Sequence, residues 1–136
     1  MKEILFICTH NSARSQIAEG LVNVLHSDKF RAFSAGTVKS KVNPFAIKAL
    51  EDMGIDISRH RSKSIEEFRG RLFDIVVTVC DNAHETCPFF PGKKVIHRDF
   101  KDPSDFIGSD AEKLAVFIKT RDEINLWIKE NILSLS

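Results

Sequence analysis

Residues 2–25 read KEILFICTHNSARSQIAEGLVNVL and hold three successive patterns. Lys2–Ile7 is a short apolar run, which predicts a buried strand. A loop of small and polar residues follows, and from about Ser15 onward apolar residues recur at helical spacing: Ile17, Ala18, Leu21, Val22 and Leu25. A strand, a loop and a helix in this order are typical of the first unit of a parallel sheet.

The rest of the chain continues the alternation of strands and helices. Apolar and β-branched runs predict further strands at Phe30–Ser34, Leu72–Val79 and Lys94–His97. Good capping residues predict helices that begin after Asn43, Ser64 and Ser109. The expected fold is therefore α/β. It is one domain over residues 1–136, a three-layer αβα sandwich with a four-stranded parallel sheet and helices on both faces.

The two serine caps carry a more specific signal. Each stands three residues before a glutamate, Ser64 before Glu67 and Ser109 before Glu112, which is the spacing of a reciprocal capping box. The first box predicts a short helix that ends near Arg69. The second opens the last helix, whose expected buried face is interrupted by Arg121 and consists of Leu114, Phe117, Ile124 and Ile128.

Composition narrows the class of protein. With 136 residues, 43% of them hydrophobic, the chain can build its own core. A net charge of +1 with both signs interspersed argues against a nucleic-acid or anionic-membrane surface. The apolar stretch Ile4–Cys8 is too short for a signal peptide or a membrane span. Three cysteines without a secretory signal favour a reducing compartment, so we expect a cytoplasmic protein.

Residues with chemical potential follow the predicted strands. Cys8 comes after the first strand, Cys80 after the third, and Asp102 shortly after the fourth. In parallel sheets the ligand lies beyond the carboxyl ends of the strands. We therefore expect these three side chains to gather at one edge of the sheet.

The loop between the first strand and the first helix is suited to an anion. Its backbone N–H groups and the helix N-terminus form an anion nest, and Arg14 can grip two oxygens of a tetrahedral oxyanion. The same positive potential favours the thiolate of Cys8, and Ser12 and Ser15 can donate hydrogen bonds to the sulfur. Asn11 tolerates left-handed backbone angles. The expected oxyanion-binding residues are Thr9, His10, Asn11, Ser12, Ala13, Arg14 and Ser15.

A plainer interpretation remains, because a cysteine and an arginine six positions apart also occur by chance. Cys8 would then be a buried cysteine at a strand end, and Arg14 a solvated residue at a helix start. The position of the pair between strand and helix favours the functional interpretation.

The string CTHNSARS after the first strand, together with Asp102-Pro103, resembles the low-molecular-weight protein tyrosine phosphatase superfamily, and within it the thioredoxin-coupled arsenate reductases. The similarity extends to residues 34–37, 54–56, His60 and residues 79–81. The resemblance implies Cys8 as nucleophile, Arg14 as the anion-gripping residue and Asp102 as general acid. Asp99 and Asp105 lie nearby and are competitors for the last role.

Two further cysteines separate the branches of this superfamily. The segment CDNAHETC places Cys87 seven residues after Cys80, as the redox segment of the reductases does. The resemblance implies that Cys8 attacks arsenate, that Cys80 then attacks Cys8 and releases arsenite, and that Cys87 attacks Cys80. Thioredoxin would reduce the resulting disulfide near the surface. Residues 81–87 are expected to form a turn or short helix that unwinds.

The sequence alone allows other interpretations of these cysteines. Cys80 can be a core cysteine, or Cys80, His84 and Cys87 can hold zinc, although a fourth ligand is missing. A phosphatase would hydrolyse phosphomonoesters through a Cys8 phosphocysteine intermediate. Phosphate and sulfate are expected to bind the loop as analogues of arsenate. The absence of tyrosine from the chain speaks against a phosphotyrosine docking site. A non-catalytic anion-binding domain would tolerate Cys8→Ala.

The resemblance also bears on metals. Some reductases of this branch bind potassium beside the active loop, and Asn11, Glu19 and Ser34 match three of the ligands. Arg61 and Lys63 stand where we align the others. A lysine ammonium can replace the ion, so we expect no required metal and no cofactor.

Overall fold

The computed structural model describes residues 1–81, 85 and 87–136. Its centre is a four-stranded parallel sheet in the order β2-β1-β3-β4. The strands are β1 (Lys2–Cys8), β2 (Phe30–Gly36), β3 (Phe73–Thr78) and β4 (Gly92–His97). The predicted α/β class and parallel sheet are confirmed. β4 begins two residues before the expected Lys94 and is the most exposed strand, with two lysines of the kind that discourage edge pairing.

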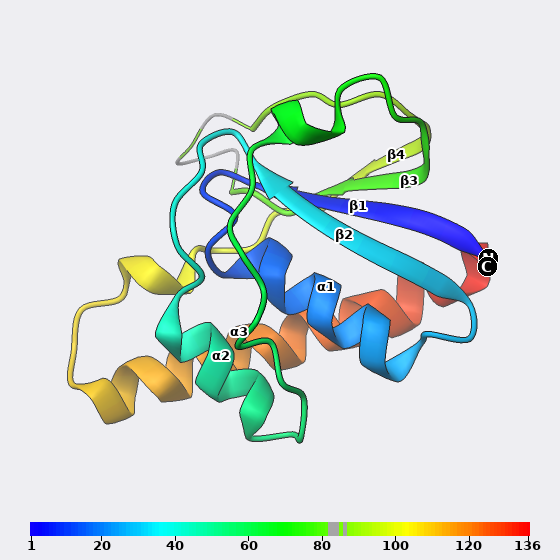
Figure 1. Ribbon diagram of the computed structural model, residues 1–136. Helices are drawn as coiled ribbons and strands as arrows, with labels where there is room; N and C mark the ends of the chain where they lie inside the picture. Colours follow the sequence, from blue (N-terminus) through cyan, green and yellow to red (C-terminus); the bar gives the residue numbers. More distant parts are fainter. Residues whose placement is uncertain (82–84, 86) are drawn as a thin grey trace.

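One face of the sheet carries all three long helices, as Figure 1 shows. They are α1 (Arg14–Leu25), α2 (Pro44–Glu51) and α3 (Asp110–Asn131). Strand residues that point to this face form the main core with the apolar stripes of the helices: Ile4, Phe6 and Val77 against Ile17, Leu21, Leu50, Phe117, Ile124 and Ile128. Among the described residues no helix is both long and apolar enough to cross a lipid bilayer.

The opposite face has a thinner cover. A single 3-10 turn, η1 (Ile65–Phe68), lies over it with the chain around Phe90 (Figure 1). Leu5, Ile7 and Val76 pack there against a small aromatic cluster. The cover is short because Gly70, with φ of +83°, turns the chain after one helical turn.

The two predicted capping boxes have different outcomes. Ser109 and Glu112 make both reciprocal hydrogen bonds, so α3 begins as expected. At η1 the Ser64 hydroxyl accepts from the N–H of Glu66 instead, and the Glu67 carboxylate pairs with Arg61. The first box is therefore incomplete, because a charged partner for Glu67 lies within reach.

The contacts of Arg121 explain why an arginine lies in the buried stripe of α3. Its guanidinium donates to the carbonyl oxygen of Ala49 at 2.7 Å and to the carboxylate of Asp52 at 3.0 Å. It thus binds the carbonyl end of α2, where a cation also complements the helix dipole. The residue joins two helices and is not a break in the core.

The central pair of strands sets the position of the functional residues. Ile7 of β1 pairs with Thr78 of β3, and the N–H of Val79 donates to the carbonyl of Ile7 at 2.8 Å. Cys8 and Cys80 therefore leave neighbouring strands at the same edge of the sheet. The expected meeting of the strand ends is confirmed.

Candidate functional site

Cys8 ends β1 as a buried free thiol, only 2% exposed. Its sulfur lies 2.8 Å from the hydroxyl oxygen of Ser15 in the first turn of α1. The amide of Asn11 donates to the same oxygen at 2.8 Å, which leaves the Ser15 proton free to point at the sulfur. A hydroxyl that donates to sulfur stabilises the thiolate, the nucleophilic form. The expected partner Ser15 is present, whereas Ser12 lines the cavity beside the sulfur.

Asn11 fixes the shape of the loop. It adopts the expected left-handed conformation, with φ of +51°, and is fully buried. Its side-chain oxygen accepts from the backbone N–H of Lys63 and from the side chain of Gln16, each at 2.8 Å. The loop also packs onto Gly36 of β2, where a Cβ would lie 2.7 Å from backbone atoms of Thr9 and Asn11. The anion nest is thus held from several directions.

Arg14 is almost fully buried, with 2% exposure, and grips a carboxylate. Its two terminal nitrogens lie 2.9 Å from the two oxygens of Glu85, and one also donates to the Phe100 carbonyl at 3.1 Å. Burial lowers the pKa of Arg14, but the Glu85 hydrogen bond and the charges of Cys8 and Asp102 raise it above its ordinary value. The guanidinium is therefore a permanent cation. Among the described residues its buried Nε has no acceptor, so a donor remains for a bound anion.

Asp102 is the acid that reaches the loop. One carboxylate oxygen lies 3.4 Å from Arg14, and the other accepts from the backbone and hydroxyl of Ser104 at 3.0 and 2.6 Å. Its competitors lie elsewhere: Asp99 pairs with His97, and Asp105 is exposed. A cavity of about 230 Å³ joins the loop to this acid, lined by Cys8, His10, Ser12, Ala13, Arg14, Ser40, Asp102 and Ser104.

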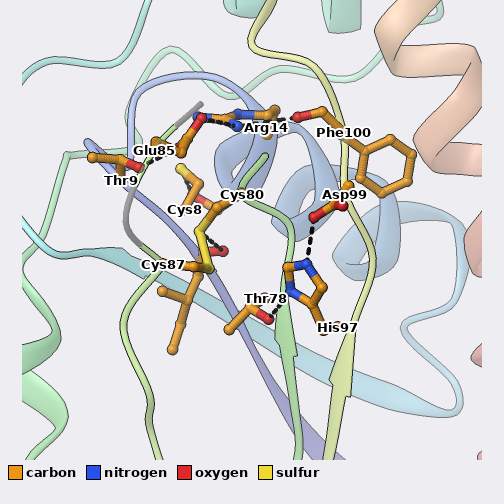
Figure 2. Close-up of a disulfide and its surroundings, with 12 residues drawn as sticks. Cys8, Thr9, Arg14, Thr78, Cys80, Glu85, Cys87, His97, Asp99 and Phe100 are labelled. Atoms are coloured by element: carbon orange, nitrogen blue, oxygen red, sulfur yellow. Dashed lines mark hydrogen bonds and ion pairs between the residues drawn. A yellow bond between two sulfur atoms is a disulfide. The ribbon is translucent and has the colours of Figure 1, made fainter. Parts of the chain in front are cut away.

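Cys80 and Cys87 form a disulfide, with Cα atoms 5.8 Å apart. Figure 2 shows this bond beside Cys8, below the Arg14–Glu85 pair. In this structure Cys80 is therefore not a lone core thiol, and neither sulfur is a thiolate available to bind zinc. Cys80 is fully buried and Cys87 half-buried, so among the described residues Cys87 is the more accessible side of the disulfide. Of the expected turn or helix over 81–87, residues 82–84 and 86, including the proposed zinc ligand His84, lie outside the described residues.

Glu85 is the functional residue that sequence reasoning missed. Besides Arg14 it accepts a hydrogen bond from the Thr9 hydroxyl (Figure 2). Burial raises the pKa of Glu85, but the hydrogen bonds from Arg14 and Thr9 outweigh it and hold the pKa below its ordinary value. One signal was available: a buried arginine needs an anionic partner, and Glu85 is an acid between two cysteines that close onto the same sheet edge.

A polar group behind the loop contains the residues matched to a potassium site. The Ser34 hydroxyl donates to Glu19 at 2.6 Å, and the Lys63 ammonium lies 3.9 Å from Glu19 and 2.9 Å from the Arg61 carbonyl. Burial lowers the pKa of Lys63, and Glu19 offsets part of that shift. Lys63 thus supplies positive charge beside Glu19. The side chain of Arg61 instead turns to Glu67 at the surface. That the protein requires no metal stays a prediction.

Known proteins resemble this chain in sequence and in fold. Residues 3–132 match the family described as low molecular weight phosphotyrosine protein phosphatase. The chain is 44% identical to an arsenate reductase of Halalkalibacterium halodurans over 94% of this chain and 93% of that protein. A solved arsenate reductase in the phosphate binding state covers 100% of both chains, with a TM-score of 0.83 and 32% identity. A low molecular weight protein tyrosine phosphatase from T. tengcongensis covers 98% and 99%, with a TM-score of 0.76 and 28% identity.

Proposed function

This chain belongs to the low molecular weight phosphotyrosine protein phosphatase family, and we propose that it is an arsenate reductase, which converts arsenate to arsenite. The observation that carries the proposal is the Cys80–Cys87 disulfide at the sheet edge where Cys8 ends β1. Of the three cysteines, a hydrolase of this family needs only the nucleophile, whereas a reductase must also supply two electrons. Three thiols at one edge of the sheet can supply these electrons. The similarity to proteins named arsenate reductase also extends over almost the whole chain.

The first half of the reaction forms a bond between sulfur and arsenic. The Cys8 thiolate attacks arsenate held by the loop N–H groups and Arg14. Asp102 donates a proton to the departing oxygen, which leaves as water. The product is an As(V) adduct on Cys8. The 3.4 Å contact between Asp102 and Arg14 keeps the acid at the cavity where that oxygen departs.

The second half moves two electrons. The Cys80 thiolate attacks the sulfur of Cys8, the S–As bond breaks, and its electron pair stays on arsenic, which leaves as arsenite. Cys87 then attacks Cys80, which frees the Cys8 thiolate and forms the Cys80–Cys87 disulfide. An external dithiol, thioredoxin in our proposal, reduces that disulfide. Since Cys80 is buried and Cys87 is not, the reductant attacks the Cys87 sulfur.

Two consequences follow for the setting of the enzyme. Each turnover consumes a dithiol, so the protein works in a compartment that keeps thiols reduced, which we propose to be the cytoplasm. The family match spans residues 3–132, which supports one catalytic domain over 1–136. We propose no nucleic-acid or membrane partner.

A slow phosphatase activity is the second candidate. Cys8, Arg14 and Asp102 suffice for a phosphocysteine route, and a tyrosine phosphatase shares the fold. The disulfide favours the reductase as the main activity, because hydrolysis has no use for it.

One assay tests the proposal. The purified protein is supplied with arsenate, thioredoxin, thioredoxin reductase and NADPH, and NADPH oxidation and arsenite are measured together. We expect one arsenite for each NADPH consumed, and no reaction when phosphate replaces arsenate. Rapid p-nitrophenyl phosphate hydrolysis without arsenate-dependent NADPH oxidation would identify a phosphatase instead.

A further inference from the structure

The arginine of the oxyanion loop already holds an anion, the carboxylate of Glu85. Both terminal nitrogens of Arg14 lie 2.9 Å from the two carboxylate oxygens, in the two-pronged geometry of a guanidinium with an oxyanion. The Thr9 hydroxyl donates to one of these oxygens. Arg14 and the Glu85 side chain are 2% and 17% exposed, so solvent screens the pair little. Glu85 therefore makes with Arg14 the contact that the loop offers to its substrate.

This contact exists while the disulfide is closed. Glu85 lies two residues before Cys87, inside the segment that the Cys80–Cys87 bond ties to the sheet edge. The Glu85 N–H also donates to the Asp81 carbonyl at 3.0 Å. Covalent closure of the segment raises the effective concentration of the carboxylate at Arg14. Opening the disulfide removes that advantage.

A bound oxyanion and Glu85 compete for the same nitrogens. The cavity over Cys8 is lined by Arg14 but not by Glu85, so the carboxylate leaves space for an anion there. Such an anion finds only Nε of Arg14 without an acceptor among the described residues. To gain the two-pronged contact with both terminal nitrogens it must displace Glu85, the acceptor that holds both of them, whereas Phe100 and Asp102 each hold one. If it does not, two negative groups share one cation, and like charges at such distances disfavour each other.

We propose that Glu85 is an internal competitor of the oxyanion, which weakens anion binding when the Cys80–Cys87 disulfide is closed. The oxidised enzyme then binds phosphate or unreacted arsenate more weakly than the reduced enzyme, in which Arg14 is released from Glu85. Linkage requires the converse: an oxyanion favours the dithiol over the disulfide by the same factor. The inference rests on the proposed function only in taking the Cys8–Arg14 loop as the oxyanion site.

The first test measures binding of inorganic phosphate, which does not oxidise thiols. Calorimetric titration at constant ionic strength compares protein holding the disulfide with protein reduced by dithiothreitol. We expect phosphate to bind the oxidised form about tenfold more weakly, a difference of about 1.4 kcal/mol. Glu85→Gln should bring the two affinities together. Glu130→Gln, which removes a charge from the exposed side of α3, should keep the tenfold ratio.

The second test reads the redox equilibrium, which a merely structural role for Glu85 would not make phosphate-dependent. In a thiol–disulfide buffer, saturating phosphate should raise the reduction potential of the Cys80–Cys87 couple by about 30 mV, the equivalent of a tenfold ratio. Chloride at equal ionic strength should not raise it, and neither should phosphate in Glu85→Gln. Should that variant fail to fold, the wild-type ratio and potential still decide.

The outcomes separate this inference from the proposed function. Equal phosphate affinity in both redox states of the wild type, or an unchanged ratio in a folded Glu85→Gln, overturns the role of Glu85 whatever the arsenate assay shows. A tenfold ratio in a protein that reduces no arsenate supports Glu85 and removes the reductase assignment.

Discussion

The Cys8–Arg14 loop and the Cys80–Cys87 segment meet at the same edge of the sheet but are held in different ways. The loop is fixed by contacts that no reaction step needs to break: Asn11 to Lys63, Ser15 to Asn11, and the close approach to Gly36. The described residues of the segment are held by the disulfide and by Glu85 on Arg14. Reduction breaks the first of these contacts, and anion binding competes with the second. The nucleophile is therefore preorganised, and the relay is conditional on redox state.

The largest effect should come from removing members of the relay. Cys87→Ser should release one arsenite per molecule and then stop, with a Cys8–Cys80 disulfide trapped. Cys80→Ser should release none. A disulfide requires Cα atoms within about 7 Å, and neighbouring strand ends bring Cys8 and Cys80 toward that limit. Peptide mapping after a single exposure to arsenate identifies the trapped bond.

The double variant Cys80→Ser/Cys87→Ser is the control, since it leaves the loop intact. It should still hydrolyse p-nitrophenyl phosphate slowly, because Cys8, Arg14 and Asp102 remain. Sustained turnover of arsenate by Cys87→Ser with thioredoxin would contradict the relay.

The second-largest effect should come from replacing the guanidinium group of Arg14. Arg14→Lys keeps the charge but cannot hold two oxygens at once, so we expect arsenate turnover to fall by about 10²–10³-fold. Arg121→Lys serves as the matched control, because Arg121 is also buried but lies on α3. It should lower stability and leave turnover per folded molecule near the wild-type value. Equal rate losses in both variants would show that Arg14 acts through the fold alone.

The packing of the loop on β2 should have a smaller effect. In Gly36→Ala the new Cβ would meet backbone atoms of Thr9 and Asn11 at 2.7 Å, so the loop must shift. We expect a loss of about 1–3 kcal/mol in the free energy of unfolding together with weaker phosphate binding. Gly70→Ala is strained for a different reason, its φ of +83°, and its new Cβ would meet no atom within 4 Å. It should lose stability but keep phosphate affinity, as urea unfolding and calorimetry would show.

The two regions also differ in how far the sequence predicted them. The meeting of Cys8, Arg14 and Asp102 at one cavity was predicted because each lies at or after the end of a strand, and parallel strands end at one edge; their catalytic roles stay a prediction. The left-handed conformation of Asn11 could also be predicted, because asparagine tolerates positive φ angles better than most residues. Glu85 was missed, because its partner is 71 residues away in the sequence and only its position between Cys80 and Cys87 pointed to that contact.

The cover of the second sheet face shows the same limit. Ser64 and Glu67 have the spacing of a capping box, yet Glu67 pairs with Arg61 and the element is a single 3-10 turn. The spacing of Ser64 and Glu67 permits a capping-box hydrogen bond, but a nearby charged side chain can pair with the glutamate instead. The predictions from periodicity therefore held for β1, β3 and α3, where burial of apolar side chains determines the structure. The prediction was less accurate at η1, where an ion pair between individual side chains determines it.

The smallest effect should be the pH dependence of the Arg14–Glu85 ion pair, which joins the two regions. The pKa of Glu85 is held below its ordinary value, against burial, by hydrogen bonds from Arg14 and Thr9. A carboxylate with a depressed folded-state pKa contributes stability above its unfolded pKa, and that stability is lost as pH falls through the folded pKa. The melting temperature of the oxidised wild type should therefore exceed that of Glu85→Gln at pH 7, and the gap should narrow below pH 4.5.

Glu66→Gln breaks a pair of the same type with Arg69, but at the surface, where screening leaves little net energy. Its melting curve should follow the wild type at both pH values. If Glu85→Gln did the same in the oxidised state, the Arg14–Glu85 pair would not hold the segment to the loop.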